Sequence, residues 1–90
     1  MTKEQMKAYF YNKIEDLRNK ITHCKEMINL YNEMIDKGEQ LTDTQKYILD
    51  FNTKDKFEYI NQQMELEQMF EDFFKIRYFD YRWNKQKGNN

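Results

Sequence analysis

Apolar residues recur at a heptad spacing along the first third of the chain. Isoleucine occupies every seventh position, and other apolar or bulky residues fall between the isoleucines. The series comprises Phe10, Ile14, Leu17, Ile21, Cys24, Ile28, Tyr31 and Ile35. Steps that alternate between four and three residues are typical of a helix whose apolar seam packs along another helix. The spacing therefore predicts a helix over residues 3–37 with this seam buried.

Two capping signals and one glycine divide the chain. Thr2 is followed three residues later by Gln5, a capping-box pattern that marks a helix start. Gly38 suits the left-handed position that commonly ends a helix. Thr42 and Gln45 repeat the capping box. These signals predict a turn over residues 38–42 and a second helical region that begins at residue 43.

The second helical region has one candidate break. Asn52 and Thr53 are adjacent, and both side chains can compete with a helix by bonding to the local backbone. We therefore predict a short helix over 43–51, a long helix over 54–83 and a tail over 84–90, with one unbroken helix from residue 43 as the alternative. The expected fold is a single all-α domain over residues 1–90, a long antiparallel helical hairpin resembling a coiled coil.

Charged residues favour the antiparallel orientation. Lys13, Arg18 and Lys20 flank the seam of the first helix, whereas residues 58–72 contain five acidic residues and no basic one. A chain that folds back at residues 38–41 brings together residues whose numbers add up to about 80, which sets 58–72 opposite 8–22. Opposite charges select an orientation even though each exposed pair contributes little stability.

Aromatic residues are concentrated near the C-terminus, where seven of the fourteen residues from Phe70 to Trp83 are aromatic. A helix over 54–83 would pass the end of the first helix near residue 78 and leave several rings uncovered. Tyr, Trp and Arg concentrate at protein interfaces, so we predict a protein-binding or dimer surface here. Its candidate residues are Phe74, Arg77, Tyr78, Tyr81, Arg82 and Trp83. A core where three helices meet, and base stacking of a single nucleic-acid strand on residues 75–87, are the alternatives.

Residue chemistry gives little support for catalysis. The chain contains no serine and no glycine-rich loop, and His23 is its one histidine. His23 and the single cysteine, Cys24, point about 100° apart on a helix and offer too few ligands for a metal site. We therefore expect no enzyme activity, no cofactor and no catalytic or metal-binding residue.

Composition and charge bound the function. A net charge of -1 argues against a general nucleic-acid binder, although the acidic residues of 58–72 could also mimic DNA. No apolar run approaches the ~20 residues of a membrane span, so we expect a cytoplasmic protein (in the host cytoplasm if it is viral). Phe, Tyr, Met, Ile, Asn and Lys make up 48 of 90 residues, a bias towards AT-rich codons. The favoured interpretation is a small adaptor, regulator or inhibitor from a phage, mobile element or low-GC bacterium, which acts as a homodimer on a partner protein of unknown identity.

The seam yields the first testable prediction. Ile21→Asp places an unpaired carboxylate among seam residues, and its desolvation costs several kcal/mol, comparable with the ~5 kcal/mol stability of a small domain. We expect circular dichroism to show an unfolded chain. Unchanged helicity and melting of the variant would mean that the seam faces solvent.

Overall fold

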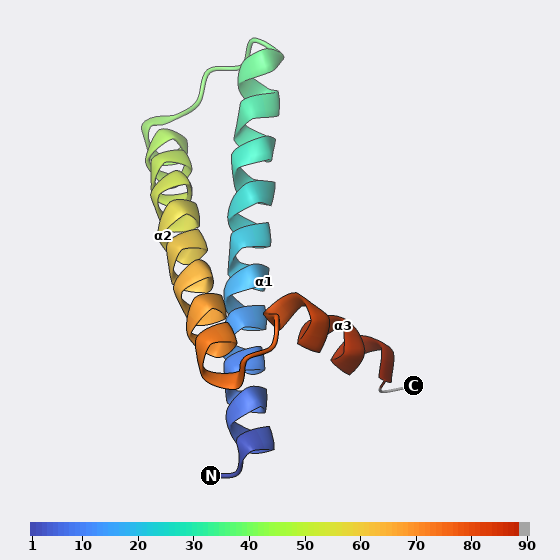
Figure 1. The fold of residues 1–90 in the computed structure, drawn as a ribbon. Helices are drawn as coiled ribbons and strands as arrows, with labels where there is room; N and C mark the ends of the chain where they lie inside the picture. The colour runs from blue at the N-terminus through green and yellow to red at the C-terminus, as the bar shows by residue number, and fades with distance from the viewer. Residues whose placement is uncertain (89–90) are drawn as a thin grey trace.

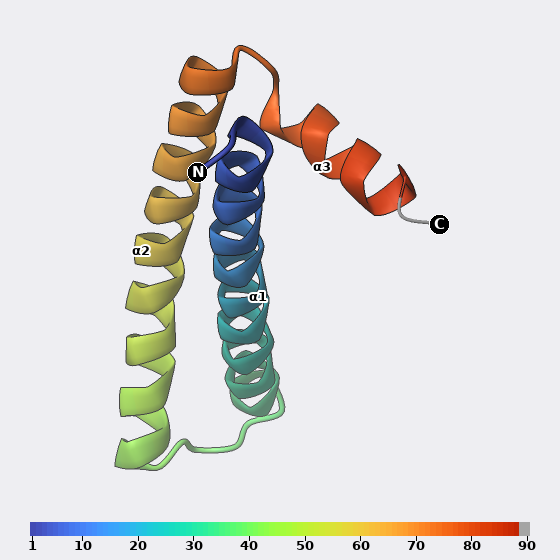
Figure 2. The ribbon, with the colours of Figure 1, turned by 90° about the horizontal axis from the view of Figure 1, so that it is seen from below.

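Three α-helices account for most of the chain in the computed structural model, which describes residues 1–88. They are α1 (Lys3–Asp36), α2 (Asp43–Phe74) and α3 (Tyr78–Gly88). α1 and α2 run antiparallel side by side, and α3 begins beside α1, on the side away from α2, and points away from the hairpin (Figures 1 and 2). The predicted all-α hairpin is confirmed.

Both predicted capping boxes are formed. The Thr2 hydroxyl accepts a hydrogen bond from the Gln5 backbone N–H at 3.1 Å, and the Gln5 side chain accepts one from the Thr2 N–H at 2.8 Å. Thr42 and Gln45 repeat the arrangement at 3.1 and 2.9 Å. Gly38 has a φ of +83°, in the left-handed region that glycine adopts without strain. The local signals at residues 2, 38 and 42 therefore set both ends of α1 and the start of α2.

Most of the heptad seam is buried between α1 and α2. Ile14, Leu17, Ile21, Cys24 and Tyr31 are buried. Ile35 departs from the prediction, because 48% of its surface is exposed. It borders a surface hollow with Leu41 and Leu49, at the end where the helices spread apart (Figure 1). The seam is therefore closed along most of α1 and opens near the turn.

The register of the hairpin follows the prediction. The rings of Phe10 and Phe70 lie 6.0 Å apart, and the Lys20 ammonium lies 5.6 Å from the Tyr59 ring centroid. Both pairs have residue numbers that add up to about 80. However, Arg18 pairs with Glu15 at 3.8 Å and Lys20 with Asp16 at 3.2 Å, both within α1. No ion pair joins α1 to α2 in the part of the chain that the structure describes, so apolar packing holds the two helices together.

The predicted break at Asn52 and Thr53 is wrong, and so is the short helix over 43–51. The Asn52 side-chain amide donates to the Ile48 carbonyl oxygen, and the Thr53 hydroxyl donates to the Leu49 carbonyl oxygen, both at 2.8 Å. These bonds reach back one turn within the helix and leave its backbone ladder in place. α2 is therefore one helix, which was the alternative.

The real break lies at residues 75–77, so the predicted helix over 54–83 is wrong as well. Lys75 caps the C-terminal end of α2 in the left-handed conformation, with φ 59°. This conformation costs a residue other than glycine about 1–2 kcal/mol. Turning the chain here buries Tyr78, and full burial of a large apolar side chain contributes about 1.5–3 kcal/mol. Residues 84–88 of the predicted tail belong to α3, and residues 89–90 lie outside the described part. α2 stops short of the N-terminal end of α1 instead of passing it (Figure 1).

A small aromatic core forms where the three helices meet. Ile14 of α1, Phe70 and Phe74 of α2, and Tyr78 of α3 are buried together. The Phe70 ring lies 4.8 Å from that of Phe74 and 5.3 Å from that of Tyr78, within the range of favourable aromatic pairs. This core fixes where α3 begins.

Lys75 and Gly38 form a matched pair for a second prediction, since both have a positive φ and both are exposed. Lys75→Gly removes the left-handed strain and should raise the free energy of unfolding by about 1 kcal/mol. Gly38→Ala introduces the same strain and should lower it by a similar amount, with open space around the new methyl group. Urea unfolding measures both changes. A lower stability for the glycine variant would show that residue 75 does not adopt this conformation.

Candidate protein-binding surface

One carboxylate of α1 holds the start of α3. Glu15 Oε2 accepts a hydrogen bond from the Tyr78 hydroxyl and another from Arg82 Nε, each at 2.9 Å. A second carboxylate, Glu71 Oε2 of α2, accepts the Tyr78 backbone N–H at 2.9 Å, a donor that the first turn of a helix leaves without an intrahelical partner. α3 is therefore bonded to both helices of the hairpin at its first turn.

The protonation states of these groups favour the contact. Burial and the hydrogen bond to Glu15 raise the pKa of the Tyr78 hydroxyl above its ordinary value. The hydrogen bond to Glu15 also raises the pKa of Arg82, against the opposing effect of burial. Tyr78 therefore remains a neutral donor and Arg82 a charged one, and bonds to an ionised acceptor are stronger than neutral bonds.

The inner face of α3 continues this contact along α1. Tyr81 packs edge-on against Tyr11 of α1, with ring centroids 6.2 Å apart. The Lys85 ammonium lies 5.2 Å from the Tyr11 ring centroid and 5.9 Å from that of Tyr81, a distance at which cations and aromatic rings attract. Tyr78, Tyr81, Arg82 and Lys85 thus form the side of α3 that faces the hairpin.

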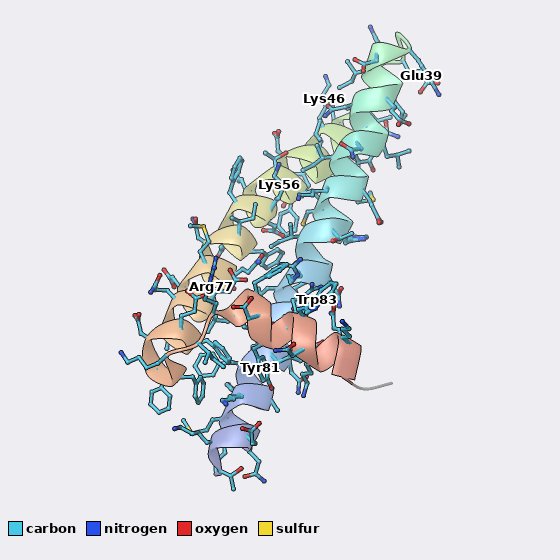
Figure 3. All side chains as sticks on the ribbon, turned by 45° about the vertical axis from the view of Figure 1, so that its right-hand side comes forward. Glu39, Lys46, Lys56, Arg77, Tyr81 and Trp83 are labelled. Carbon is cyan, nitrogen blue, oxygen red and sulfur yellow. The ribbon has the colours of Figure 1, made fainter. Side chains whose placement is uncertain are left out.

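The opposite side of α3 presents two large rings to solvent. Phe79 is 65% exposed and Trp83 is 57% exposed, and they lie four residues apart on one face of the helix. Trp83 also borders a shallow hollow with Gln86 and Lys87, and the Lys87 ammonium lies 5.9 Å from its ring centroid. We call Phe79, Trp83, Gln86 and Lys87 the outer face of α3. Figure 3 shows Tyr81 and Trp83 on opposite sides of the helix.

The six residues predicted for the interface therefore divide into three pairs. Phe74 and Tyr78 belong to the core, with Tyr78 only 1% exposed, so their assignment to a contact surface is wrong for this fold. Tyr81 and Arg82 are half-buried against α1, whereas Arg77 and Trp83 are exposed. The predicted alternative, a core where three helices meet, describes the first pair. The helical break at residues 75–77 contains no glycine or proline that would reveal it in the sequence.

Phe79 is an exposed ring of the outer face that the predicted set does not include. Consecutive residues of a helix point about 100° apart, so burial of Tyr78 turns Phe79 outward. The outward direction of Phe79 can be inferred only when the start of α3 and its buried face are known.

Other candidate chemistry stays dispersed in the fold. His23 is exposed, and Cys24 is buried in the seam. Burial raises the pKa of the Cys24 thiol, and the nearby Asp55 carboxylate raises it further, which disfavours the reactive thiolate. Residues 1–88 contain no cluster of three or more His, Cys, Asp or Glu side chains that could hold a metal ion. No described helix is both long and apolar enough to cross a membrane.

Comparison with known proteins adds no family. No protein-family model, curated protein or solved structure matches the chain.

Glu15 generates the third prediction. Glu15→Ala leaves the buried Tyr78 hydroxyl without its acceptor and removes the partner of Arg82, at a cost of about 1–3 kcal/mol. Amide hydrogen exchange should accelerate in α3 while the middle of α1 and α2 stays protected. The control is Asp16→Ala, which removes only the exposed pair with Lys20. Equal exchange in the two variants would contradict the proposed attachment of α3.

Proposed function

We propose that this protein is a non-enzymatic protein-binding module, a small adaptor, regulator or inhibitor that occupies the surface of another protein through the outer face of α3. The observation that carries the proposal is the division of the aromatic segment. One side of α3 is attached to the hairpin, while Phe79 and Trp83 on the other side face solvent.

The attachment of α3 supports binding because it reduces the entropy lost on association. Side chains on a helix that is already bonded to its support need less ordering than those on a flexible tail. Exposed Trp and Phe side chains supply large apolar areas, and Trp is among the residues most enriched in the energetic centres of interfaces. The Lys87 ammonium, which lies 5.9 Å from the Trp83 ring centroid, adds a cationic group to this face.

The contacts of the basic residues near the C-terminus favour protein binding over the nucleic-acid alternative. Among the cations of residues 75–87, Arg82 is bonded to Glu15, and Lys85 and Lys87 lie against aromatic rings of the chain itself. Aromatic anchoring to a protein should depend weakly on salt, whereas binding to a nucleic-acid strand should weaken steeply as counterions compete for the phosphates.

Photo-cross-linking in the native cell tests the proposal and is the fourth prediction. A photoreactive residue at position 79 or 83 should capture the same protein at both positions, whereas one at Phe57, an equally exposed ring on α2, should not. The double variant Phe79→Ser, Trp83→Ser should weaken binding of the captured protein at least about tenfold, as expected for loss of two anchors, with helicity unchanged. Capture of nucleic acid at positions 79 and 83, or of no macromolecule, would overturn the proposal.

A further inference from the structure

The hairpin has two broad sides, and α3 lies against only one of them. On the first side, Glu15, Arg18 and Ile60 line a hollow together with Arg82 of α3. On the second side, Lys20, His23, Phe51 and Tyr59 line another hollow between α1 and α2, and no α3 residue borders it. Arg18 and Lys20 point about 200° apart around α1, so the two hollows lie on opposite sides of the hairpin.

Large apolar side chains are exposed on the side without α3. Phe51 borders its hollow directly, and at 100° per residue Met69 and Phe73 of α2 point in nearly the same direction as Phe51. On α1, Tyr9 points in nearly the same direction as Lys20. Leu30 lies seven residues after His23 and Tyr47 four residues before Phe51, so both point in nearly the same direction as these two residues, which line the hollow. We call the following residues, all about half exposed or more, the hairpin face: Tyr9, Leu30, Tyr47, Phe51, Met69 and Phe73.

These residues form two apolar ends around a polar middle. In the register set by the contacts of Phe10 with Phe70 and of Lys20 with Tyr59, Tyr9 lies level with Met69 and Phe73. Leu30 lies level with Phe51 by the same register. Charged side chains occupy the middle, with Lys13 and Lys20 on α1 and Glu58 and Glu65 on α2.

We infer that a second copy of this chain covers the hairpin face, so that two hairpins form a four-helix bundle with both α3 helices on the outside. A twofold axis parallel to the helices places α1 of one copy over α2 of the other without shifting either along its length. The apolar ends then meet, Tyr9 over Met69 and Phe73 of the second copy, and Leu30 over its Phe51.

Charge complementarity selects a second copy in this orientation. The same axis sets Lys13 level with Glu65 and Lys20 level with Glu58 of the other chain, and each pair occurs twice. A twofold axis perpendicular to the helices would instead stack α2 on α2, where residues 58–72 contain no basic residue. Like charges across an interface disfavour that arrangement.

The exposed area also fits a dimer. Aromatic side chains present ~150–250 Å² each, so the half-exposed members of the hairpin face leave on the order of 600–700 Å² of apolar-rich surface. A stable interface covers about 800 Å² on each partner. The polar middle supplies the remainder.

Four variants of α2 test the apolar part of the inference in matched pairs. Phe51→Asp with Met69→Asp alters the hairpin face, whereas Phe57→Asp with Met64→Asp alters the opposite flank of the same helix at similar exposure: 53% and 55% against 58% and 61%. Sedimentation equilibrium of the wild type should give the mass of two chains at micromolar concentration. The first pair should raise the dissociation constant at least about a hundredfold, and the second should leave it within about threefold.

A charge exchange tests the partner and its orientation. Lys20→Glu and Glu58→Lys should each weaken the dimer about threefold or more, and the double variant should recover most of the loss. Circular dichroism should show a helical chain in every case. A wild type that remains a monomer at 100 µM, or a dimer that survives Phe51→Asp with Met69→Asp, would overturn the inference.

The outcome is independent of the function proposed for α3. Phe79→Ser with Trp83→Ser should leave the dimer mass unchanged while it abolishes partner capture. A dimer that dissociates in this variant and not in the hairpin-face variant would place self-association on α3 and would overturn the inference. Loss of partner capture with an unchanged dimer mass would leave the dimer inference supported. The proposed function and the dimer inference can therefore be refuted independently.

Discussion

The burial of Tyr78 against Ile14 and Phe70 is the contact on which the arrangement of the three helices depends. Packing of apolar side chains favours an unbroken α2 as long as α1 lies beside it. α2 instead ends before α1 does (Figure 1), and a turn at residues 75–77 brings the Tyr78 ring onto the hairpin. The strained backbone at Lys75 is tolerated because the contact that it permits is worth more than the strain.

A polar interaction makes that burial specific. The hydroxyl of a buried tyrosine needs a partner, and Glu15, the residue directly after Ile14, supplies one. Arg82 reaches the same oxygen from one turn further along α3, so α3 is held at two points rather than one. Two points of attachment fix the rotation of a helix, and rotation decides which rings reach solvent. The exposure of Phe79 and Trp83 is therefore a consequence of the hydrogen bonds of Glu15.

The sequence predicted the hairpin well because its signals are local or periodic. A heptad seam, two capping boxes and one glycine act within a few residues of the position that they determine, and α1, the turn and the start of α2 follow from them. The break before α3 depends on contacts between residues more than sixty positions apart, such as Glu15 with Tyr78. No local pattern encodes such a contact, so the division of the aromatic segment into core and surface could not be predicted. The opposite error occurred at Asn52 and Thr53, where residues that often end helices bond back into the helix instead.

The apolar surface left over by this fold links stability to association. In residues 1–88 eight apolar side chains are buried, while thirteen large ones remain exposed, and a domain of this size has a marginal core. Any partner that binds only the folded chain stabilises it by mass action. A second copy on the hairpin face would extend the core across two chains and leave α3 outside. In that arrangement the hairpin serves mainly as a support, and α3 remains exposed and able to bind a different protein. The separation follows from where Glu15 and Tyr9 of the hairpin face lie on α1, about a third of a turn apart.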